Sequence, residues 1–129
     1  MNIASVMTPC PYKIPAKSSL NDALAMMEER GIRHLPVFEG EEVIGIVWES
    51  LVRSALFVCE SSKFCPDCGT IAEKDPFVVS VADDVGDVAK TMADRKLDCA
   101  LVQDEEENFV GIFTSTDAFR ALYLFLGDQ

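Results

Sequence analysis

The sequence predicts a mixed α/β (α+β) fold of two pseudo-symmetric β-α-β-β-α repeats packed through their sheets. The main observation is an internal repeat, because residues 20–48 are echoed by residues 85–114 and Met27 meets Met92 at an offset of 65. Two copies of one supersecondary unit usually bury a face against each other, so an internal repeat is stronger evidence for the fold than the amino-acid composition. The length of 129 residues and the 49% apolar content are sufficient for a real core.

The first repeat is expected to run through residues 12–14 (extended), 20–30 (helix), 33–38 and 43–48 (strands) and 49–58 (helix). Ser18 or Ser19 can cap the first of these helices, and Gly31 is expected to end it. The two strands flank the acidic turn at residues 39–42 and should therefore pair as a hairpin.

The second repeat follows the same plan through residues 77–80 (extended), 84–96 (helix), 98–103 and 109–113 (strands) and 115–126 (helix). The apolar side chains of its last helix are expected to pack in the core, with a partner helix as the alternative. The predicted boundaries are 1–58 for the first repeat, 59–74 for a cysteine-containing connector and 75–129 for the second repeat.

The charge balance excludes one class of partner. The net charge is −11, with 22 acidic and 11 basic residues, so the chain lacks the basic surface of a duplex nucleic-acid binder. The sequence has neither a secretory-type start nor an apolar stretch long enough for membrane insertion. A cytoplasmic location is the default expectation, and there the five cysteines would be thiols or metal ligands rather than a disulfide framework.

Short motifs recur in order along the chain, at residues 6–9 (Val-Met-Thr-Pro), 31–37 (Gly-Ile-Arg-His-Leu-Pro-Val), 45–47 (Gly-Ile-Val), 75–76 (Asp-Pro) and 111–117 (Gly-Ile-Phe-Thr-Ser-Thr-Asp). Together they resemble a tandem pair of cystathionine-beta-synthase (CBS) domains, the arrangement called a Bateman module. The resemblance implies a regulatory protein, not an enzyme, that binds AMP, ADP, ATP or S-adenosylmethionine between its repeats. It also implies a homodimer and a regulated partner such as an enzyme or transporter.

The family's ribose motif, a Ser or Thr followed three residues later by Asp, is matched by Thr114 and Asp117. A carboxylate on the first turn of a helix can accept hydrogen bonds from both ribose hydroxyls. The backbone amides near Ser115 and Thr116 would favour a phosphate through the positive end of the helix. The alternative is a capping box, in which the same two side chains satisfy the helix start.

The resemblance also implies an apolar adenine slot between the first strand of the second repeat and its hairpin. The expected residues are Val78, Val79, Ala100, Leu101 and Ile112. The alternative is that all five belong to the core.

The phosphates would point toward the first repeat, where Arg33 and His34 hold positions that are often basic in the family. A guanidinium offers bidentate phosphate contact and an imidazole an additional donor. Structural roles for both side chains are the alternative. Trp48 and Leu51 replace the ribose motif in the first repeat, so we expect one nucleotide per chain, or none if Trp48 closes the cavity.

The connector contains Cys65-Pro66-Asp67-Cys68-Gly69, a form that resembles the knuckle of zinc ribbons. Cys65, Cys68 and Cys59 are therefore candidate ligands for zinc, with a fourth ligand to be found elsewhere. A disulfide within the Cys-x-x-Cys pair and inert thiols are the alternatives.

Two functions follow from these patterns. The first is a regulatory sensor of adenosine nucleotides with one site in the second repeat, acting through a partner or a homodimer. The second is a metal- or redox-responsive interaction protein that uses the Cys65 and Cys68 knuckle and keeps only a vestigial nucleotide site.

Overall fold

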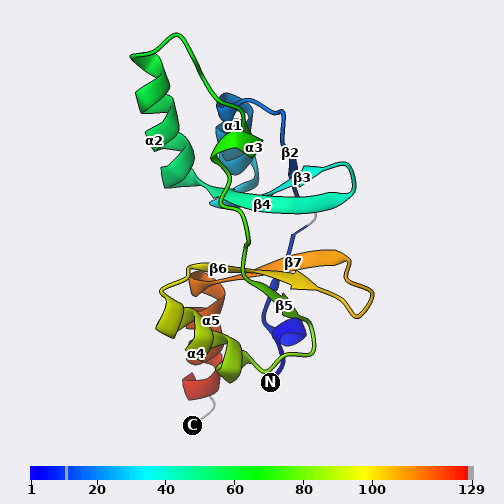
Figure 1. Cartoon of the computed structure of the whole chain (residues 1–129). Helices are drawn as coiled ribbons and strands as arrows, with labels where there is room; N and C mark the ends of the chain where they lie inside the picture. Colours follow the sequence, from blue (N-terminus) through cyan, green and yellow to red (C-terminus); the bar gives the residue numbers. More distant parts are fainter. Residues whose placement is uncertain (11, 128–129) are drawn as a thin grey trace. The chain divides into compact units, whose positions relative to one another are not determined.

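The computed structural model describes residues 1–10 and 12–127, which form two compact units (Figure 1). One unit is Tyr12–Pro76, and the other combines Met1–Pro11 with Phe77–Gln129. The first ten residues thus fold with the second repeat, although the sequence boundaries grouped them with the first. Both units contain a sheet covered by helices, in agreement with the predicted mixed α/β class.

The unit Tyr12–Pro76 contains β2 (Ile14–Pro15), α1 (Leu20–Arg30), β3 (His34–Glu39), β4 (Glu42–Trp48), α2 (Glu49–Glu60) and α3 (Cys68–Ile71). Its three-stranded sheet has the order β2-β3-β4, with β2 parallel and β4 antiparallel to β3. The three helices lie on one face of this sheet (Figure 1). Leu20, Met27, Leu35 and Val47 are buried in the core between the helices and the sheet.

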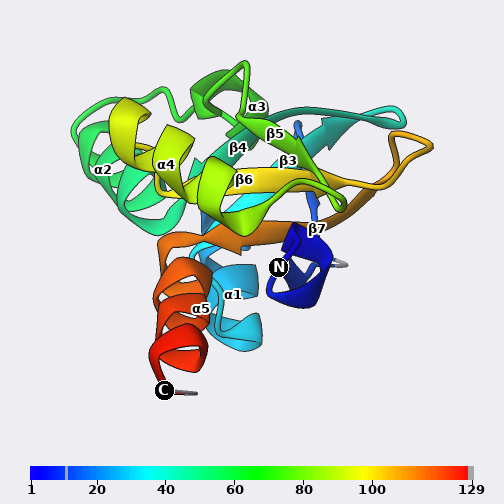
Figure 2. The ribbon, with the colours of Figure 1, turned by 90° about the horizontal axis from the view of Figure 1, so that it is seen from below.

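The other unit contains a 3-10 turn (Ile3–Ser5), β1 (Thr8–Pro9), β5 (Val78–Ser80), α4 (Val85–Arg95), β6 (Cys99–Gln103), β7 (Phe109–Thr114) and α5 (Ser115–Gly127). Its four-stranded sheet has the order β1-β7-β6-β5. Helices α4 and α5 and the N-terminal turn, dark blue in Figure 2, lie on one face of it. Ile3, Met92 and Phe113 are buried in the core that these elements share.

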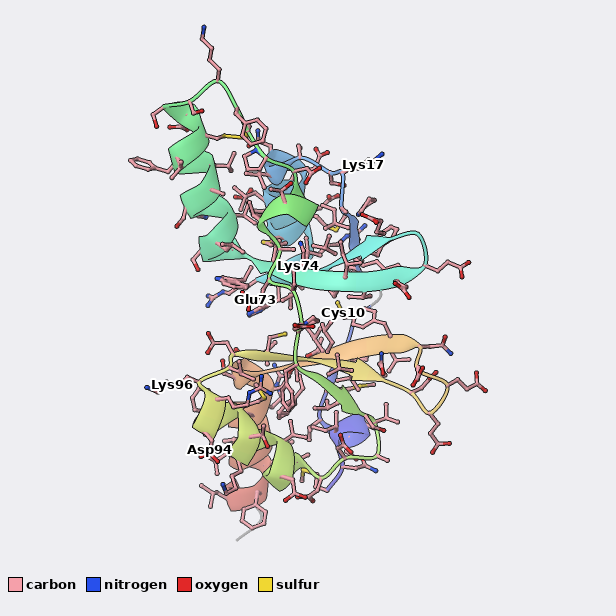
Figure 3. The ribbon with its side chains drawn as sticks, in the orientation of Figure 1. Cys10, Lys17, Glu73, Lys74, Asp94 and Lys96 are labelled. Atoms are coloured by element: carbon pink, nitrogen blue, oxygen red, sulfur yellow. A yellow bond between two sulfur atoms is a disulfide. The ribbon has the colours of Figure 1, made fainter. Side chains whose placement is uncertain are left out.

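The equivalent helices α1 and α4 begin and end by the same devices. The side chains of Ser19 and Asp84 accept hydrogen bonds from backbone N–H groups at the two helix starts, at 3.0 and 3.2 Å. Both helices end at a residue in the left-handed conformation, Gly31 with φ of 65° and Lys96 with φ of 57°. Figure 3 shows Lys96 at the end of α4.

Each sheet also pairs with a short segment that comes just before the other repeat in the sequence. Thr8 lies in β1, which pairs with β7, and Glu73 forms the equivalent antiparallel bridge with Ile46 of β4. A Cβ atom on Gly111 would lie 2.7 Å from the carbonyl oxygen of Thr8, and one on Gly45 would lie 2.5 Å from that of Glu73. The two repeated glycines therefore allow the crossing backbones to approach the sheets.

The apolar residues of α5 differ from the expectation that they pack in the core. Tyr123 is 74% exposed, Phe125 60% and Leu126 55%, whereas Ala121 is buried. The reason is that α5 turns only one side toward the sheet. Within residues 1–10 and 12–127, no helix combines the length and the apolarity needed to cross a bilayer.

Candidate functional site

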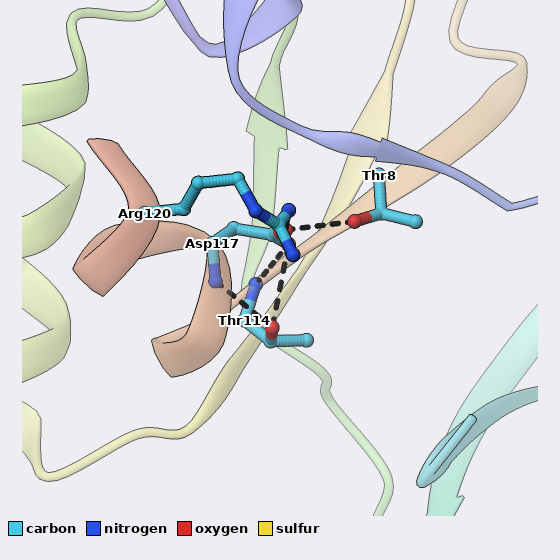
Figure 4. Close-up of polar contacts among 4 residues, drawn as sticks. All are labelled: Thr8, Thr114, Asp117 and Arg120. Carbon is cyan, nitrogen blue, oxygen red and sulfur yellow. Dashed lines mark hydrogen bonds and ion pairs between the residues drawn. The ribbon is translucent and has the colours of Figure 1, made fainter. Parts of the chain in front are cut away.

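Asp117, on the first turn of α5, is a buried charged residue with 2% of its surface exposed. One carboxylate oxygen, Oδ1, accepts hydrogen bonds from Thr8 Oγ1 at 2.7 Å and from the Arg120 guanidinium at 3.0 Å. The other, Oδ2, accepts from the Thr114 backbone N–H at 3.0 Å and from Thr114 Oγ1 at 3.3 Å (Figure 4). These four hydrogen bonds, of which the one from Arg120 is also an ion pair, compensate the burial of this charge.

In a further hydrogen bond the Asp117 backbone N–H donates to Thr114 Oγ1 at 3.4 Å.

Thr114 and Asp117 therefore form the reciprocal pair that defines a capping box. The capping alternative raised by the sequence is thus present in the structure. The Ser115 backbone N–H donates to the carbonyl oxygen of Asp98 at 3.0 Å, so this amide is not available to a phosphate. Thr116, the other residue expected near a phosphate, is exposed on the first turn of α5.

The five residues expected in the adenine slot divide between the two faces of their sheet. Val79 and Ala100 are buried in the core beneath the helices, because neighbouring residues of a strand point to opposite faces. Val78, Leu101 and Ile112 share the other face, since Leu101 is the register partner of both Val78 and Ile112. Val78 is 42% exposed, while Leu101 and Ile112 are buried. Three of the five expected residues thus share the face that points away from this core.

Arg33 and His34, the expected phosphate contacts, belong to the unit Tyr12–Pro76. Arg33 is exposed, and its carbonyl oxygen accepts a hydrogen bond from the Glu49 backbone N–H at 2.9 Å. His34 begins β3 and is the register partner of Trp48. In the part of the chain that the structure describes, the Arg33 side chain forms no ion pair.

The first repeat carries no carboxylate at the position of Asp117. Leu51 stands there and packs against the core of its unit, and Trp48 precedes α2 without a side-chain capping hydrogen bond. Trp48 is half-buried. The capping geometry of Asp117 is therefore specific to the second repeat.

The cysteines of the connector do not form the expected zinc knuckle. Cys59 and Cys65 are joined in a disulfide, which removes both thiolates as ligands and replaces the pairing expected from Cys-x-x-Cys. Cys68 is buried, and its thiol donates to the Ser19 carbonyl oxygen at 3.4 Å. Among residues 1–10 and 12–127, no three His, Cys, Asp or Glu side chains are grouped to hold a metal. The disulfide contradicts the expectation of free thiols at Cys59 and Cys65, and the described residues do not support the expected zinc site.

Two of the remaining thiols, those of Cys68 and Cys99, have a raised pKa. Burial, reinforced by the nearby Asp67, raises the pKa of Cys68 to about 11. Burial, reinforced by Cys10 and Asp117, raises the pKa of Cys99 to about 12. Both side chains are thus protonated at neutral pH and are weak nucleophiles and ligands.

Sequence reasoning did not identify Thr8 and Arg120 as partners of Asp117. Arg120 lies three residues after Asp117, a spacing at which helical side chains are neighbours, so that contact could have been found. Thr8 lies in the Val-Met-Thr-Pro motif, but its contact spans 109 residues of sequence. No local pattern predicts such a contact.

A protein-family model described as the CBS domain matches residues 3–47 and 68–124 of this chain. Among curated proteins, inosine-5'-monophosphate dehydrogenase of Korarchaeum cryptofilum (strain OPF8) is 31% identical over 106 residues. That match covers 82% of this chain and 21% of the dehydrogenase, so the chain spans about a fifth of that relative's length.

Solved structures of CBS domains share the fold. CBSX2 in complex with AMP has a TM-score of 0.81 at 22% identity, with 96% of this chain and 97% of that chain covered. The CBS domain pair of MJ0100 with 5'-methylthioadenosine and S-adenosyl-L-methionine has a TM-score of 0.83 at 22% identity and covers 100% and 98%. The CBS domain of a bacterial CNNM/CorC family Mg²⁺ transporter with ATP has a TM-score of 0.77 at 23% identity and covers 93% and 85%. The resemblance inferred from the sequence motifs is confirmed.

Proposed function

Since this chain belongs to the CBS domain family, we propose that it is a regulatory module that binds an adenosine nucleotide at Asp117 and has no catalytic activity of its own. The ligand class is AMP, ADP, ATP or S-adenosylmethionine. The AMP, S-adenosyl-L-methionine and ATP complexes of the structural neighbours support this class. Signalling would then pass to a partner or through a homodimer.

The observation that carries the proposal is the buried carboxylate of Asp117 at the start of α5. A buried charge is costly, and a hydrophobic residue would suffice for packing, as Leu51 does at the equivalent position. A carboxylate that is fixed by the backbone at one oxygen is suited to bind a diol at the other.

The proposal assigns the ligand's parts to different residues. Asp117, with Thr114 beside it, would bind the ribose. Val78, Leu101 and Ile112, which share one face of the sheet, would contact the adenine. We assign the phosphates to Arg33 and His34 on the basis of the family resemblance.

Calorimetric titration of the purified chain with AMP, ADP, ATP and S-adenosylmethionine tests the proposal. At least one ligand should release or absorb heat with a stoichiometry of one per chain. Asp117→Asn should abolish this binding, because an amide lacks the negative charge that strengthens hydrogen bonds from ribose hydroxyls. Asp87→Asn is the matched control, since Asp87 is an exposed carboxylate on the first turn of α4. A folded protein that binds none of the four ligands would contradict the proposal.

The partner is proposed at two levels. The exposed apolar residues of α5 provide a surface for a second copy of the chain. The likeness to part of a dehydrogenase and to a domain of a transporter supports a regulated enzyme or transporter as the further partner.

A second candidate function is redox-responsive interaction, which the Cys59–Cys65 disulfide favours. Phe57, Val58 and Phe64 flank this disulfide and are 78%, 65% and 70% exposed. Reduction would free the segment between the two cysteines and rearrange these apolar side chains. Binding of an apolar fluorescent dye, measured with and without a reductant, tests this function, with Cys59→Ser/Cys65→Ser as the control. Equal dye binding in both states of the wild-type chain would contradict it.

A further inference from the structure

The carboxylate of Asp117 has no acceptor position left for a ligand in the structure. Oδ1 accepts from Thr8 and Arg120, and Oδ2 accepts twice from Thr114. An ionised carboxylate offers about four lone-pair positions, so these donors fill it. A ribose diol brings two further O–H donors and can therefore bind only by displacing donors of the protein.

The two oxygens differ in what their partners support. The Thr114 contacts at Oδ2 cap the start of α5, so losing them would expose the first turn of the helix. The contacts at Oδ1 come from the 60% exposed Arg120 side chain and from Thr8 on a different strand. Release of these two donors leaves the helix cap intact, which makes Oδ1 the exchangeable side.

We propose that the Thr8 hydroxyl and the Arg120 guanidinium hold the positions on Asp117 that a ribose diol takes when it binds. Thr8 is then an internal competitor of the ligand, and its release is the first structural consequence of binding. This inference rests on the proposed function, because it requires an adenosine ligand at Asp117.

The displaced residue belongs to the segment that leads out of its unit. Thr8 lies in β1, which crosses β7 over Gly111, and Cys10 follows with a long backbone hydrogen bond of 3.5 Å to Val110. Tyr12, two residues later, already belongs to the other compact unit. Loss of the 2.7 Å contact between Thr8 and Asp117 would therefore loosen the short β1 strand at the point where the chain passes from one unit to the other.

The other unit provides an internal comparison. Its crossing residue, Glu73, exchanges two backbone hydrogen bonds with Ile46, at 2.9 and 3.1 Å. Leu51 stands at the position equivalent to Asp117, so this crossing has no counterpart of the contact between Thr8 and Asp117. The backbone crossing is common to both units, whereas the side-chain contact belongs to the unit with the ribose motif.

Calorimetric titration with AMP of the wild-type chain, Thr8→Val and Thr8→Ser tests this inference. Thr8→Val keeps the shape and strand preference of the side chain but removes the donor, so AMP should bind about tenfold more tightly. Thr8→Ser restores a hydroxyl and should return the affinity toward the wild-type value. Thr91→Val is the matched control, because the Thr91 hydroxyl donates to the carbonyl oxygen of Asp87 within α4, and it should leave the affinity unchanged.

Hydrogen exchange on the wild-type chain gives a second readout that needs no variant. Saturating AMP should speed exchange in peptides that cover residues 8–10 and leave the peptide around Glu73 unchanged. Equal or weaker binding of AMP by Thr8→Val, or slower exchange at residues 8–10 on binding, would overturn the inference while leaving the proposed function standing. Absence of AMP, ADP, ATP and S-adenosylmethionine binding to the folded wild-type chain would overturn both.

Discussion

Asp117 combines two roles at the scale of a single residue, because the same carboxylate caps α5 and forms the proposed ligand site. We predict that Asp117→Ala lowers the free energy of unfolding by about 1–3 kcal/mol, since it leaves the Thr114 amide, the Thr8 hydroxyl and the Arg120 guanidinium without their acceptor. Urea denaturation followed by circular dichroism measures the loss.

The control for this measurement is Asp87→Ala. Asp87 lies on the first turn of α4 as an exposed carboxylate, so its removal should cost about 0.5 kcal/mol or less. Equal losses for the two variants would show that burial and the bonds of Asp117 contribute nothing beyond its position near a helix start.

Gly31 and Lys96 are equivalent positions of the two repeats that share a left-handed conformation but differ in side chain. A lysine pays a steric cost in this conformation that a glycine does not. We predict that Lys96→Gly raises the free energy of unfolding by about 1 kcal/mol and that Gly31→Lys lowers it by about the same amount. A Cβ on Gly31 would meet nothing within 4 Å, so the backbone conformation alone decides the result.

Ala93→Gly is the matched substitution for Lys96→Gly, because Ala93 is also exposed in α4 but lies within the helix. It should destabilise the protein by about 1 kcal/mol. Thermal unfolding of the three variants measures the opposite signs. A destabilising Lys96→Gly would contradict the argument from the left-handed conformation.

At the scale of the elements, the connector is held by a disulfide that the sequence did not lead us to expect. Cys59 in α2 and Cys65 lie six positions apart in the sequence, and the cross-link closes a short exposed loop. We predict that its reduction lowers the free energy of unfolding by about 2 kcal/mol and increases exchange of the last α2 amides, because the loop gains freedom.

Urea denaturation and hydrogen exchange with and without a phosphine reductant measure these two effects. The variant Cys59→Ser/Cys65→Ser should match the reduced wild-type chain and show no response to the reductant. An unfolding midpoint of the wild-type chain that is unchanged by complete reduction would contradict the prediction.

The long elements could be predicted from the sequence because their signals are local. The α1 helix has the predicted bounds, Leu20–Arg30, since a capping serine and a terminal glycine delimit an amphipathic run. The acidic turns between strand-forming runs likewise located both hairpins. The short α3 helix was missed because its four residues are too few for a periodic pattern.

The contacts of Asp117 could be predicted only where sequence neighbours form them. Thr114 and Asp117 lie three residues apart and were found, whereas Thr8 contacts Asp117 across 109 residues and was missed. The residues of the adenine slot were predicted from their positions on three strands, without asking which face of the sheet each side chain occupies. Because neighbouring side chains of a strand point to opposite faces, Val79 and Ala100 lie in the core instead.

At the scale of the whole molecule, two protonated thiols make stability depend on alkaline pH. The pKa of Cys68 is about 11 and that of Cys99 about 12 in the folded protein, against 9.0 for an ordinary thiol. The unfolded chain therefore loses these protons first as the pH rises above 9.0, so the free energy of unfolding should fall between that pH and about 11 to 12. Below pH 9.0 this contribution is fully present.

Urea denaturation at about pH 8, 9 and 10 measures this fall in the free energy of unfolding. The Cys59→Ser/Cys65→Ser background is used because it prevents disulfide exchange. Adding Cys68→Ala and Cys99→Ala should flatten the dependence on pH, whatever these substitutions do to stability at pH 8. Equal slopes with and without the two thiols would contradict the prediction.

The exposed apolar side chains of α5 predict that the chain associates with a second copy of itself. Phe119 and Tyr123 lie four residues apart on one side of this helix and are 71% and 74% exposed. Contiguous apolar surface of this kind is typical of an interface, and we expect a dimer of twice the 14.2 kDa chain mass. Phe119→Glu/Tyr123→Glu should shift the mass to 14.2 kDa, because dimerisation would bury four uncompensated charges.

Light scattering after size-exclusion chromatography measures the mass. The control is Phe57→Glu, at an equally exposed position of α2, which should leave the mass unchanged. A wild-type mass of 14.2 kDa, or dissociation by Phe57→Glu alone, would exclude α5 as the dimer surface.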